Sequence, residues 1–474
     1  MHFPKGDLII MEQKRSNFSG SLGFVLAAAG SAVGLGNIWR FPYLAAKDGG
    51  GIFLLTYIIL ALTFGFALLT TEIAIGRKTA QSPLTAYKVL HPQWGWIGIV
   101  ACIVPMMILP YYSAIGGWIL KYLFAFLTGS APTAAEADGF FGAFITSPVE
   151  PIIWFLLFLG ATTFVVYKGV NAGIERMSKV MMPILLVLII CIAVFSLTLS
   201  HTDDAGVTRT GLQGLKVYLI PNFEGMTASK LLTVVTDAMG QLFYSISVAM
   251  GIMITYGSYV KKDTDLTKSV NQIEIFDTAV AFLAGMMIIP AVYAFMGPEG
   301  LNNSGPGLMF KALPKIFDTM GGIGTVVGVA FFVMVVFAAL TSSISIMEAL
   351  VSSAMDKFKM DRKKAVLIVA AIALVVGVIV CMGYTCFYFE ADFGTVVAGQ
   401  ILDVLDYISN SVLMPVVAIA TCILIGWVVK PQTVIDEVTL GGIKFGRQNL
   451  YVVMVKYVTP VMLVVLLAKS LNLL

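Results

Sequence analysis

The sequence has little charge and few histidines and cysteines. Of its 474 residues, 12% are charged, 3 are histidine and 5 are cysteine, whereas 58% are hydrophobic. Roughly half of a soluble domain is apolar, so this composition excludes an ordinary soluble protein. It indicates instead a polytopic membrane protein, which crosses the lipid bilayer several times.

The scarcity of histidine and cysteine also excludes several kinds of site. His2, His91 and His201 fall in predicted loops or near the N-terminus, and no metal-binding motif is present, so an intramembrane enzyme is not expected. The odd number of cysteines, mostly in apolar segments, argues against a disulfide framework. The net charge of +3 gives no indication of nucleic-acid binding, because membrane topology explains its distribution better.

Long apolar runs are abundant. About 20 residues of helix cross the hydrocarbon core of a bilayer, and most runs in this chain reach or exceed that length. They predict 11 spans, near residues 21–46, 51–75, 96–127, 151–167, 180–200, 233–259, 272–297, 321–354, 365–387, 395–427 and 450–472.

Lysine and arginine are concentrated in alternate loops between these spans. The basic loops include residues 14–15, 77–88, 168–179, 261–268, 357–364 and 430–447. Because loops rich in lysine and arginine stay in the cytoplasm, the N-terminus is predicted inside and, with an odd number of spans, the C-terminus outside. We expect a multi-pass protein of the bacterial inner (plasma) membrane.

The first span contains a run of small and polar residues. Such residues do not stabilise a helix that faces lipid. Residues 30–42 read GSAVGLGNIWRFP. Gly34 and Gly36 each cost about 1 kcal/mol against alanine in a helix, and the bilayer core has no water for loosened backbone. Glycines can instead serve close helix packing, but Asn37 and Arg40 directly behind them favour a break that holds a ligand.

A second interrupted segment lies five spans later, where residues 241–251 read QLFYSISVAMG. Breaks in the first and sixth spans are typical of transporters built from inverted repeats, with the binding site at the midplane. The odd number of spans per repeat requires the inversion. The predicted fold is therefore an all-α membrane protein with a 5+5 inverted-repeat transporter fold, discontinuous helices 1 and 6, and an eleventh helix.

This fold divides the chain into five parts. They are a cytoplasmic N-terminal segment (1–17), a first repeat with helices 1–5 (18–200), an extracellular loop (201–232), a second repeat with helices 6–10 (233–427), and a cytoplasmic loop followed by helix 11 (428–474).

Seven sequence blocks carry a resemblance to one family. They are GSAVGLGNIWRFPY (30–43), GGG (49–51), TEIAIGR (71–77), YY (111–112), FYSISVAMG (243–251), FDTAVAFLAG (276–285) and ALTSSISIMEA (339–349). With these blocks in this order, residues 18–471 resemble the bacterial neurotransmitter:sodium symporters. The resemblance implies sodium-coupled import of an amino acid by alternating access, with two Na⁺ ions as cofactors.

The resemblance also implies the residues of both sodium sites. Na⁺ stripped of water needs about five or six oxygen ligands, which unwound carbonyls and hydroxyls supply. The first site would use the Ala32 carbonyl, the side chains of Asn37, Ser245 and Asp277, and a carboxylate oxygen of the substrate. The second would use the carbonyls of Gly30, Val33 and Ala338 and the hydroxyls of Thr341 and Ser342, although hydroxyls in membrane helices often only bond to the preceding turn.

Asp277 departs from the pattern of many relatives. Many have asparagine there, and chloride-dependent relatives bind Cl⁻ through residues matching Tyr57, Gln241, Ser245 and a serine. The serine position is Ala281 in this chain, and chloride-independent relatives often carry a carboxylate there. The negative charge has moved one helical turn, to Asp277, which predicts transport without chloride. A buried carboxylate needs a cation or a proton.

The substrate follows from a missing charge. Monoamine-carrying relatives have aspartate at the position of Gly34, so a substrate of this chain must bring its own carboxylate. By resemblance, the substrate would be bound by Ser31, Ala32, Leu35, Gly36, Ile108, Tyr112, Tyr244, Ser247, Met250, Ser342 and Ile346. Met250 replaces a common phenylalanine and leaves room for a hydrophobic or aromatic side chain, such as that of tyrosine or tryptophan.

Two gates are implied in the same way. Arg40, Asp406 and Tyr244 would close the extracellular side, and Arg15, Phe18, Tyr259 and Asp356 the cytoplasmic side. An ion channel is not favoured, because no loop sequence repeats in the way that a selectivity filter would require. A symporter for small aliphatic amino acids and a non-transporting amino-acid sensor remain alternatives. The expected partners are the amino acid and the lipid bilayer, without nucleic acid, and the sequence leaves monomer and dimer open.

Overall fold

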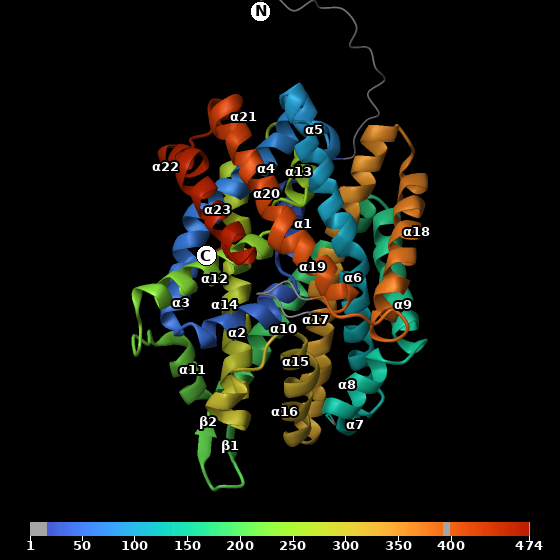
Figure 1. Cartoon of the computed structure of the whole chain (residues 1–474), viewed down its shortest axis with the longest axis vertical. Coiled ribbons are helices and arrows are strands. Elements are labelled where there is room, and N and C mark those ends of the chain that lie inside the picture. The colour runs from blue at the N-terminus through green and yellow to red at the C-terminus, as the bar shows by residue number, and fades with distance from the viewer. Residues whose placement is uncertain (1–16, 136, 392–398, 474) are drawn as a thin grey trace, which may run out of the picture.

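The computed structural model describes residues 17–135, 137–391 and 399–473 (Figure 1). Arg15, one of the residues predicted for the inner gate, lies outside these ranges. Helices make up nearly all of the structure. The described strands are β1 (Ser200–Thr202) and β2 (Thr208–Thr210), which form an antiparallel hairpin with Ser200 opposite Thr210.

Each predicted span matches a helix or a run of consecutive helical segments. The first five spans are α1 (Ser21–Ala32) with η1 (Gly36–Arg40) and α2 (Phe41–Lys47), α3 (Gly51–Leu60) with η2 (Ala61–Gly65) and α4 (Phe66–Thr79), α6 (Trp96–Leu127), α9 (Glu150–Tyr167), and η4 (Val170–Glu175) with α10 (Arg176–Leu197). The remaining spans are α12 (Ala228–Ser245) with α13 (Ile252–Gly257), α14 (Leu266–Gly300), α17 (Gly322–Phe358), α18 (Arg362–Cys381), α19 (Ile401–Asp406) with η7 (Tyr407–Leu413), α20 (Met414–Ile423) and η8 (Leu424–Val428), and α22 (Gln448–Val453) with η10 (Met454–Val458) and α23 (Thr459–Ser470).

Shorter helices occupy the loops. They are α5 (Pro83–Leu90), η3 (Pro92–Trp94), α7 (Ala131–Ala135), α8 (Ala137–Ile145), α11 (Gly211–Leu219), α15 (Gly305–Gly307), η5 (Leu308–Ala312), α16 (Leu313–Thr319), η6 (Met382–Tyr384), α21 (Gln432–Val438) and η9 (Leu440–Gly442). Figure 1 shows α5 and α21 at one end of the molecule, and the hairpin, α7, α8, α15 and α16 at the other.

Within the described residues, nine helices are long and apolar enough to cross a membrane, and a tenth span results if Ser21–Ala32 and Gly36–Lys47, bent by 53°, count as one. The predicted sixth span, α12 with α13, lies outside this count because residues 246–251 interrupt it. The fifth span begins at Val170, ten residues before the predicted start at 180, since Pro183 lies inside the helix rather than at its start. The all-α fold with discontinuous helices 1 and 6 is confirmed.

Both breaks show in the backbone. The first helix stops at Val33, whose ψ of 96° is extended rather than helical. In the second break Ser247 and Ala249 adopt left-handed φ values of 54° and 63°. Such a conformation costs a residue with a side chain about 1–2 kcal/mol, so packing must maintain it. The backbone amide of Ala249 donates to the buried Glu72 carboxylate at 2.6 Å, which fixes this segment against α4.

The two broken spans lie inside the helix bundle. Helix α1 packs against α10, α14 and α17, and α12 packs against α3. In Figure 1, α9 and α18 line one side of the molecule and α22 and α23 lie on the opposite side. The loosened backbone at both breaks is therefore surrounded by protein, as its exposed amides and carbonyls require.

A charged cluster joins three helices at the C-terminal end of the first span. Asp237 on α12 accepts from Lys47 at 3.1 Å and from Lys469 on α23 at 2.9 Å. Asp48, between α2 and α3, is only 3% exposed, and its Oδ2 has no hydrogen-bond partner in the described ranges. Burial, and then the negative charge of Asp237, raise the pKa of Asp48 to about 6.

Asp48→Asn is expected to stabilise the protein at neutral pH. The folded pKa lies above the unfolded value, so ionisation of Asp48 lowers the free energy of unfolding as the pH rises from about 4 to about 6, by about 1–3 kcal/mol in total. The variant should melt at a higher temperature than the wild type at pH 7.5, with a smaller difference at pH 5. Asp204→Asn in the exposed hairpin is the control, and equal gains at both pH values would contradict the assignment.

Candidate functional site

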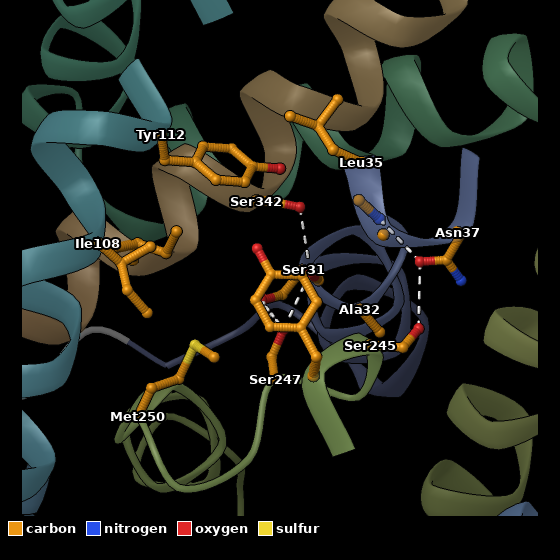
Figure 2. A pocket seen from close by; sticks show the side chains of 14 residues that line it. Ser31, Ala32, Leu35, Asn37, Ile108, Tyr112, Ser245, Ser247, Met250 and Ser342 are labelled. Atoms are coloured by element: carbon orange, nitrogen blue, oxygen red, sulfur yellow. Dashed lines mark hydrogen bonds between the residues drawn. The ribbon is translucent and has the colours of Figure 1, made fainter. Parts of the chain in front are cut away.

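A cavity lies where the two breaks face each other. It is lined by Ser31, Ala32, Gly34, Leu35, Gly36, Asn37, Ile108, Tyr112, Tyr244, Ser245, Ser247, Met250, Ser342 and Ile346 (Figure 2). All eleven residues that the sequence analysis assigns to the substrate are in this list. The structure brings them together from α1, the first break with η1, α6, α12, the second break and α17.

Hydroxyl groups connect the two breaks across this cavity. Ser247 Oγ donates to the Ser31 carbonyl at 3.0 Å, and the two serine hydroxyls lie 3.1 Å apart. Ser342 on α17 lies 3.1 Å from the same carbonyl. These contacts hold the loosened segments in place and satisfy backbone that is no longer helical.

One wall of the cavity carries an unpaired hydroxyl. The Tyr112 side chain is 4% exposed, and its Oη has no hydrogen-bond partner among the described residues. Figure 2 shows its ring extending from α6 towards the first break. A Cβ at Gly34 would lie 3.0 Å from Ser342 Oγ and 3.3 Å from Tyr112 Oη, so a side chain there would crowd both hydroxyls. A buried hydroxyl without a partner is costly, and a ligand that accepts its proton would remove the cost.

A buried carboxylate lies next to the cavity. Asp277 on α14 is 1% exposed, and its Oδ1 accepts from Asn37 Nδ2 at 2.8 Å and lies 2.8 Å from Ser245 Oγ. The Tyr57 hydroxyl donates to its Oδ2 at 3.4 Å. No lysine, arginine or histidine in the described ranges forms an ion pair with Asp277. Hydrogen bonds alone do not offset the burial of a charge, so this group of oxygens suits a hard cation such as Na⁺.

The residues predicted for the second sodium site also meet. Thr341 Oγ1 lies 3.1 Å from the Ala338 carbonyl, and Ser342 Oγ lies 3.4 Å from the Val33 carbonyl. Gly30 packs against the Thr341 side chain. Both hydroxyls also contact carbonyls of their own helix, but their lone pairs remain able to face a cation. The set again consists only of oxygen donors.

The two charged residues of the predicted outer gate are not paired in the described structure. No ion pair joins Arg40 and Asp406 among residues 17–135, 137–391 and 399–473. Asp406 Oδ1 instead accepts from Tyr111 Oη at 3.0 Å and from Asn410 Nδ2 at 2.6 Å. The sequence analysis missed both partners, although the YY block contains Tyr111. Tyr244 is half-buried and packs against Gly36, where it covers the first break.

The residues predicted for the inner gate form a partly different network from the expected one. Phe18 packs edge-on against Tyr259, and its backbone amide donates to the Tyr259 carbonyl at 3.1 Å. Asp356 accepts from the Ser82 amide at 2.7 Å. The Tyr259 hydroxyl donates at 2.6 Å to Glu348, a buried acid that the sequence analysis did not single out.

Glu348 forms an ion pair with Arg362 on α18, which contacts both carboxylate oxygens. Arg362 Nε also donates to the Val166 carbonyl at the end of α9, at 2.9 Å. The ion pair therefore connects three helices beside the predicted inner gate. The signal for it was present in the sequence, since an acid in the middle of an apolar helix needs a cation.

Comparison with known proteins agrees with this geometry. The model of the sodium:neurotransmitter symporter family matches residues 15–138 and 146–474. The sodium-dependent transporter YhdH of Bacillus subtilis is 34% identical, over 96% of this chain and 97% of its own. The sodium- and chloride-dependent GABA transporter 2 of Mus musculus is 27% identical, over 77% of this chain and 67% of its own.

A solved structure extends the comparison to three dimensions. The crystal structure of MhsT in complex with L-phenylalanine superposes with a TM-score of 0.82 and 35% identity, covering 96% of this chain and all of that one. The family consists of membrane transporters rather than enzymes, and membership implies coupling to sodium. The chain belongs to the sodium:neurotransmitter symporter family.

Proposed function

We propose that this protein imports a hydrophobic or aromatic amino acid together with two sodium ions, by alternating access and without chloride. The observation that carries the proposal is the position of Asp277: a carboxylate without an ion-pair partner in the described ranges lies beside a cavity with an unpaired hydroxyl. A sodium ion there would attract a substrate carboxylate, and the two would bind together.

The substrate would be an amino acid because the cavity lacks an acid for a bare amine. Gly34 leaves the space beside Tyr112 open, so a substrate carboxylate could accept from that hydroxyl and from the amides of the first break. Carbonyls around Ser31 and Ser247 would receive the ammonium group. This arrangement selects the backbone of an amino acid and leaves its side chain to the rest of the cavity.

The preference for a large side chain rests on the apolar wall. Ile108 on α6, Met250 in the second break and Ile346 on α17 line the cavity. Met250 is unbranched and flexible, so the wall can adapt to a ring. The related MhsT has been solved with L-phenylalanine, which favours the same class of substrate for this chain.

Two sodium ions fit the two oxygen clusters. The first ion would bind Ala32, Asn37, Ser245 and Asp277 together with the substrate. The second would bind Gly30, Val33, Ala338, Thr341 and Ser342, and would tie α1 to α17. The second cluster joins the first break to α17. Binding of its ion would therefore shift the equilibrium between the conformations that open to the two sides of the membrane.

Independence from chloride also follows from Asp277. It would supply permanently the negative charge that chloride supplies in relatives such as the GABA transporter. Ala281, one turn further along α14, is buried and offers no hydroxyl to an anion. The same negative charge would compensate part of the positive charge of the two sodium ions.

The remaining assignments complete this proposal. The chain would lie in the bacterial plasma membrane with its N-terminus inside and its C-terminus outside, and residues 18–200 and 233–427 would be the two repeats. Arg40, Asp406 and Tyr244 would close the outer side, and Arg15, Phe18, Tyr259 and Asp356 the inner side. Arg40 and Asp406 would approach each other only when the outer side closes.

Uptake of labelled amino acids into proteoliposomes tests the function. We expect uptake of phenylalanine, tyrosine or tryptophan under an inward sodium gradient, and loss of at least nine-tenths of it when choline replaces Na⁺, because the first ion completes the carboxylate site. Equal uptake in choline would contradict the proposal. Sodium-dependent binding without flux would identify a sensor, and a preference for alanine or glycine would identify a carrier of small amino acids.

A further inference from the structure

A second cavity lies on the outside of the bundle, between α3 with η2 and α14. It has a volume of about 350 Å³, and its lining includes Leu54, Ile58, Leu62, Ile275 and Ala279. Ile58, Leu62 and Ile275 are 42%, 49% and 67% exposed. Since these residues lie in membrane-crossing helices, the groove faces the hydrocarbon of the bilayer, and the occupant must be part of a lipid.

One residue in this groove is out of place for a purely apolar surface. Glu274 on α14 lines the groove, and its side chain is almost fully buried, with 5% exposed. Its Oε2 accepts from Arg447 at 2.8 Å, but its Oε1 has no hydrogen-bond partner in the part of the chain that the structure describes. A carboxylate oxygen in hydrocarbon without a donor is costly, which points to a donor supplied by the occupant.

Arg447 gives the groove a positive edge. This residue directly precedes α22, in a loop that the distribution of charge places on the cytoplasmic side. Its guanidinium group lies 3.5 Å from the centre of the Phe66 ring and donates to the Leu62 carbonyl at 3.1 Å. Its side chain is still 26% exposed, so a phosphate group can approach it.

We propose that the groove binds one phospholipid of the inner leaflet whose headgroup carries a primary ammonium, as phosphatidylethanolamine does. One acyl chain fills the apolar groove, the ammonium donates to Glu274 Oε1, and the phosphate approaches Arg447. An acid and a base side by side match a zwitterionic headgroup. Phosphatidylcholine has a positive charge but no N–H to donate, and phosphatidylglycerol has a negative charge and no ammonium.

The groove is separate from the transport cavity. Tyr57 lines the groove, and its hydroxyl contacts Asp277 beside the transport cavity. The two sites therefore have this one residue in common, but the groups that would bind the lipid headgroup do not take part in the transport cavity. Lipid binding can therefore be measured directly, and its result does not depend on which substrate the protein carries.

Native mass spectrometry of the purified full chain in detergent tests the proposal, with palmitoyl-oleoyl phosphatidylethanolamine, phosphatidylcholine and phosphatidylglycerol added separately. The wild type should bind phosphatidylethanolamine at least fivefold more tightly than either other lipid. Glu274→Gln should reduce this affinity to that for phosphatidylcholine, since the amide keeps an oxygen for Arg447 but loses the charge.

Two further variants make the test independent of how Glu274→Gln folds. Ala279→Phe fills the groove and leaves the Glu274–Arg447 pair intact, so it should also abolish the preference. Ala371→Phe is the matched control, because Ala371 lines a similar lipid-facing groove between α9 and α18 and should leave the preference unchanged. The proposal is overturned if the wild type binds the three lipids equally, or if the preference survives either Glu274→Gln or Ala279→Phe.

Discussion

Asp277→Asn is expected to lower the initial rate of sodium-driven uptake at least tenfold. The asparagine keeps one oxygen for the first sodium ion but removes the only charge in the cluster of Asn37, Ser245 and Asp277. Hydrogen bonds to a charged group contribute about 1.5–3 kcal/mol, and the attraction between the carboxylate and Na⁺ is lost in addition. The concentration of Na⁺ required for half-maximal uptake should rise accordingly.

Parallel assays in chloride and in gluconate separate the charge from the geometry. Wild-type uptake should be the same with both anions, because Asp277 supplies the negative charge. The double variant Asp277→Asn with Ala281→Ser should recover part of the rate in chloride only, since the serine offers a hydroxyl to the anion. Asp318→Asn, at an exposed position on α16, is the control for general effects of removing an acid. Chloride-dependent wild-type uptake, or an unimpaired Asp277→Asn, would refute this role.

The first break could be predicted because its signal is local. Gly34, Gly36 and Asn37 are poor residues for a lipid-facing helix, and each cost can be read from the sequence without knowledge of the packing. The structure ends the helix at Ala32, two residues into the run that starts at Gly30. The convergence of the cavity residues followed from the family resemblance, since no pattern within the chain brings Ile108 next to Ile346.

The geometry of the second break could not be predicted in the same detail. Ser247 and Ala249 are left-handed although neither is glycine. This conformation is held by contacts from elsewhere, in particular by Glu72, which accepts from the Ala249 amide. A contact over more than 170 residues leaves no trace in the local sequence, so a tertiary interaction decides against the local preference here.

The gate residues show the limit of assigning pairs by charge alone. Arg40 and Asp406 are opposite charges at the expected end, yet Tyr111 and Asn410 contact Asp406 in this conformation. Ion pairs in a transporter exist in some states and not in others, so one sequence corresponds to several sets of partners. Glu348 and Arg362 were missed for a simpler reason: their pairing required the positions of α17 and α18.

Tyr112→Phe is expected to weaken amino-acid binding about tenfold to 150-fold without destabilising the empty protein. The Tyr112 hydroxyl is buried and has no partner in the described ranges, so its removal takes away an unsatisfied polar group. The melting temperature without substrate should therefore stay the same or rise. With substrate, the variant loses a hydrogen bond to a carboxylate, about 1.5–3 kcal/mol, and this loss corresponds to the expected decrease in affinity.

Tyr87→Phe is the matched control for this prediction. The Tyr87 hydroxyl on α5 is also buried but lies 2.8 Å from Thr421 Oγ1, so its removal takes away a hydrogen bond that the empty protein already makes. That variant should melt at a lower temperature and bind the amino acid as the wild type does. Thermal melting with and without substrate in saturating Na⁺ measures both effects. If Tyr112→Phe lowered the melting temperature of the empty protein and kept the wild-type affinity, the hydroxyl would serve the fold, and the carboxylate would have to bind elsewhere in the cavity.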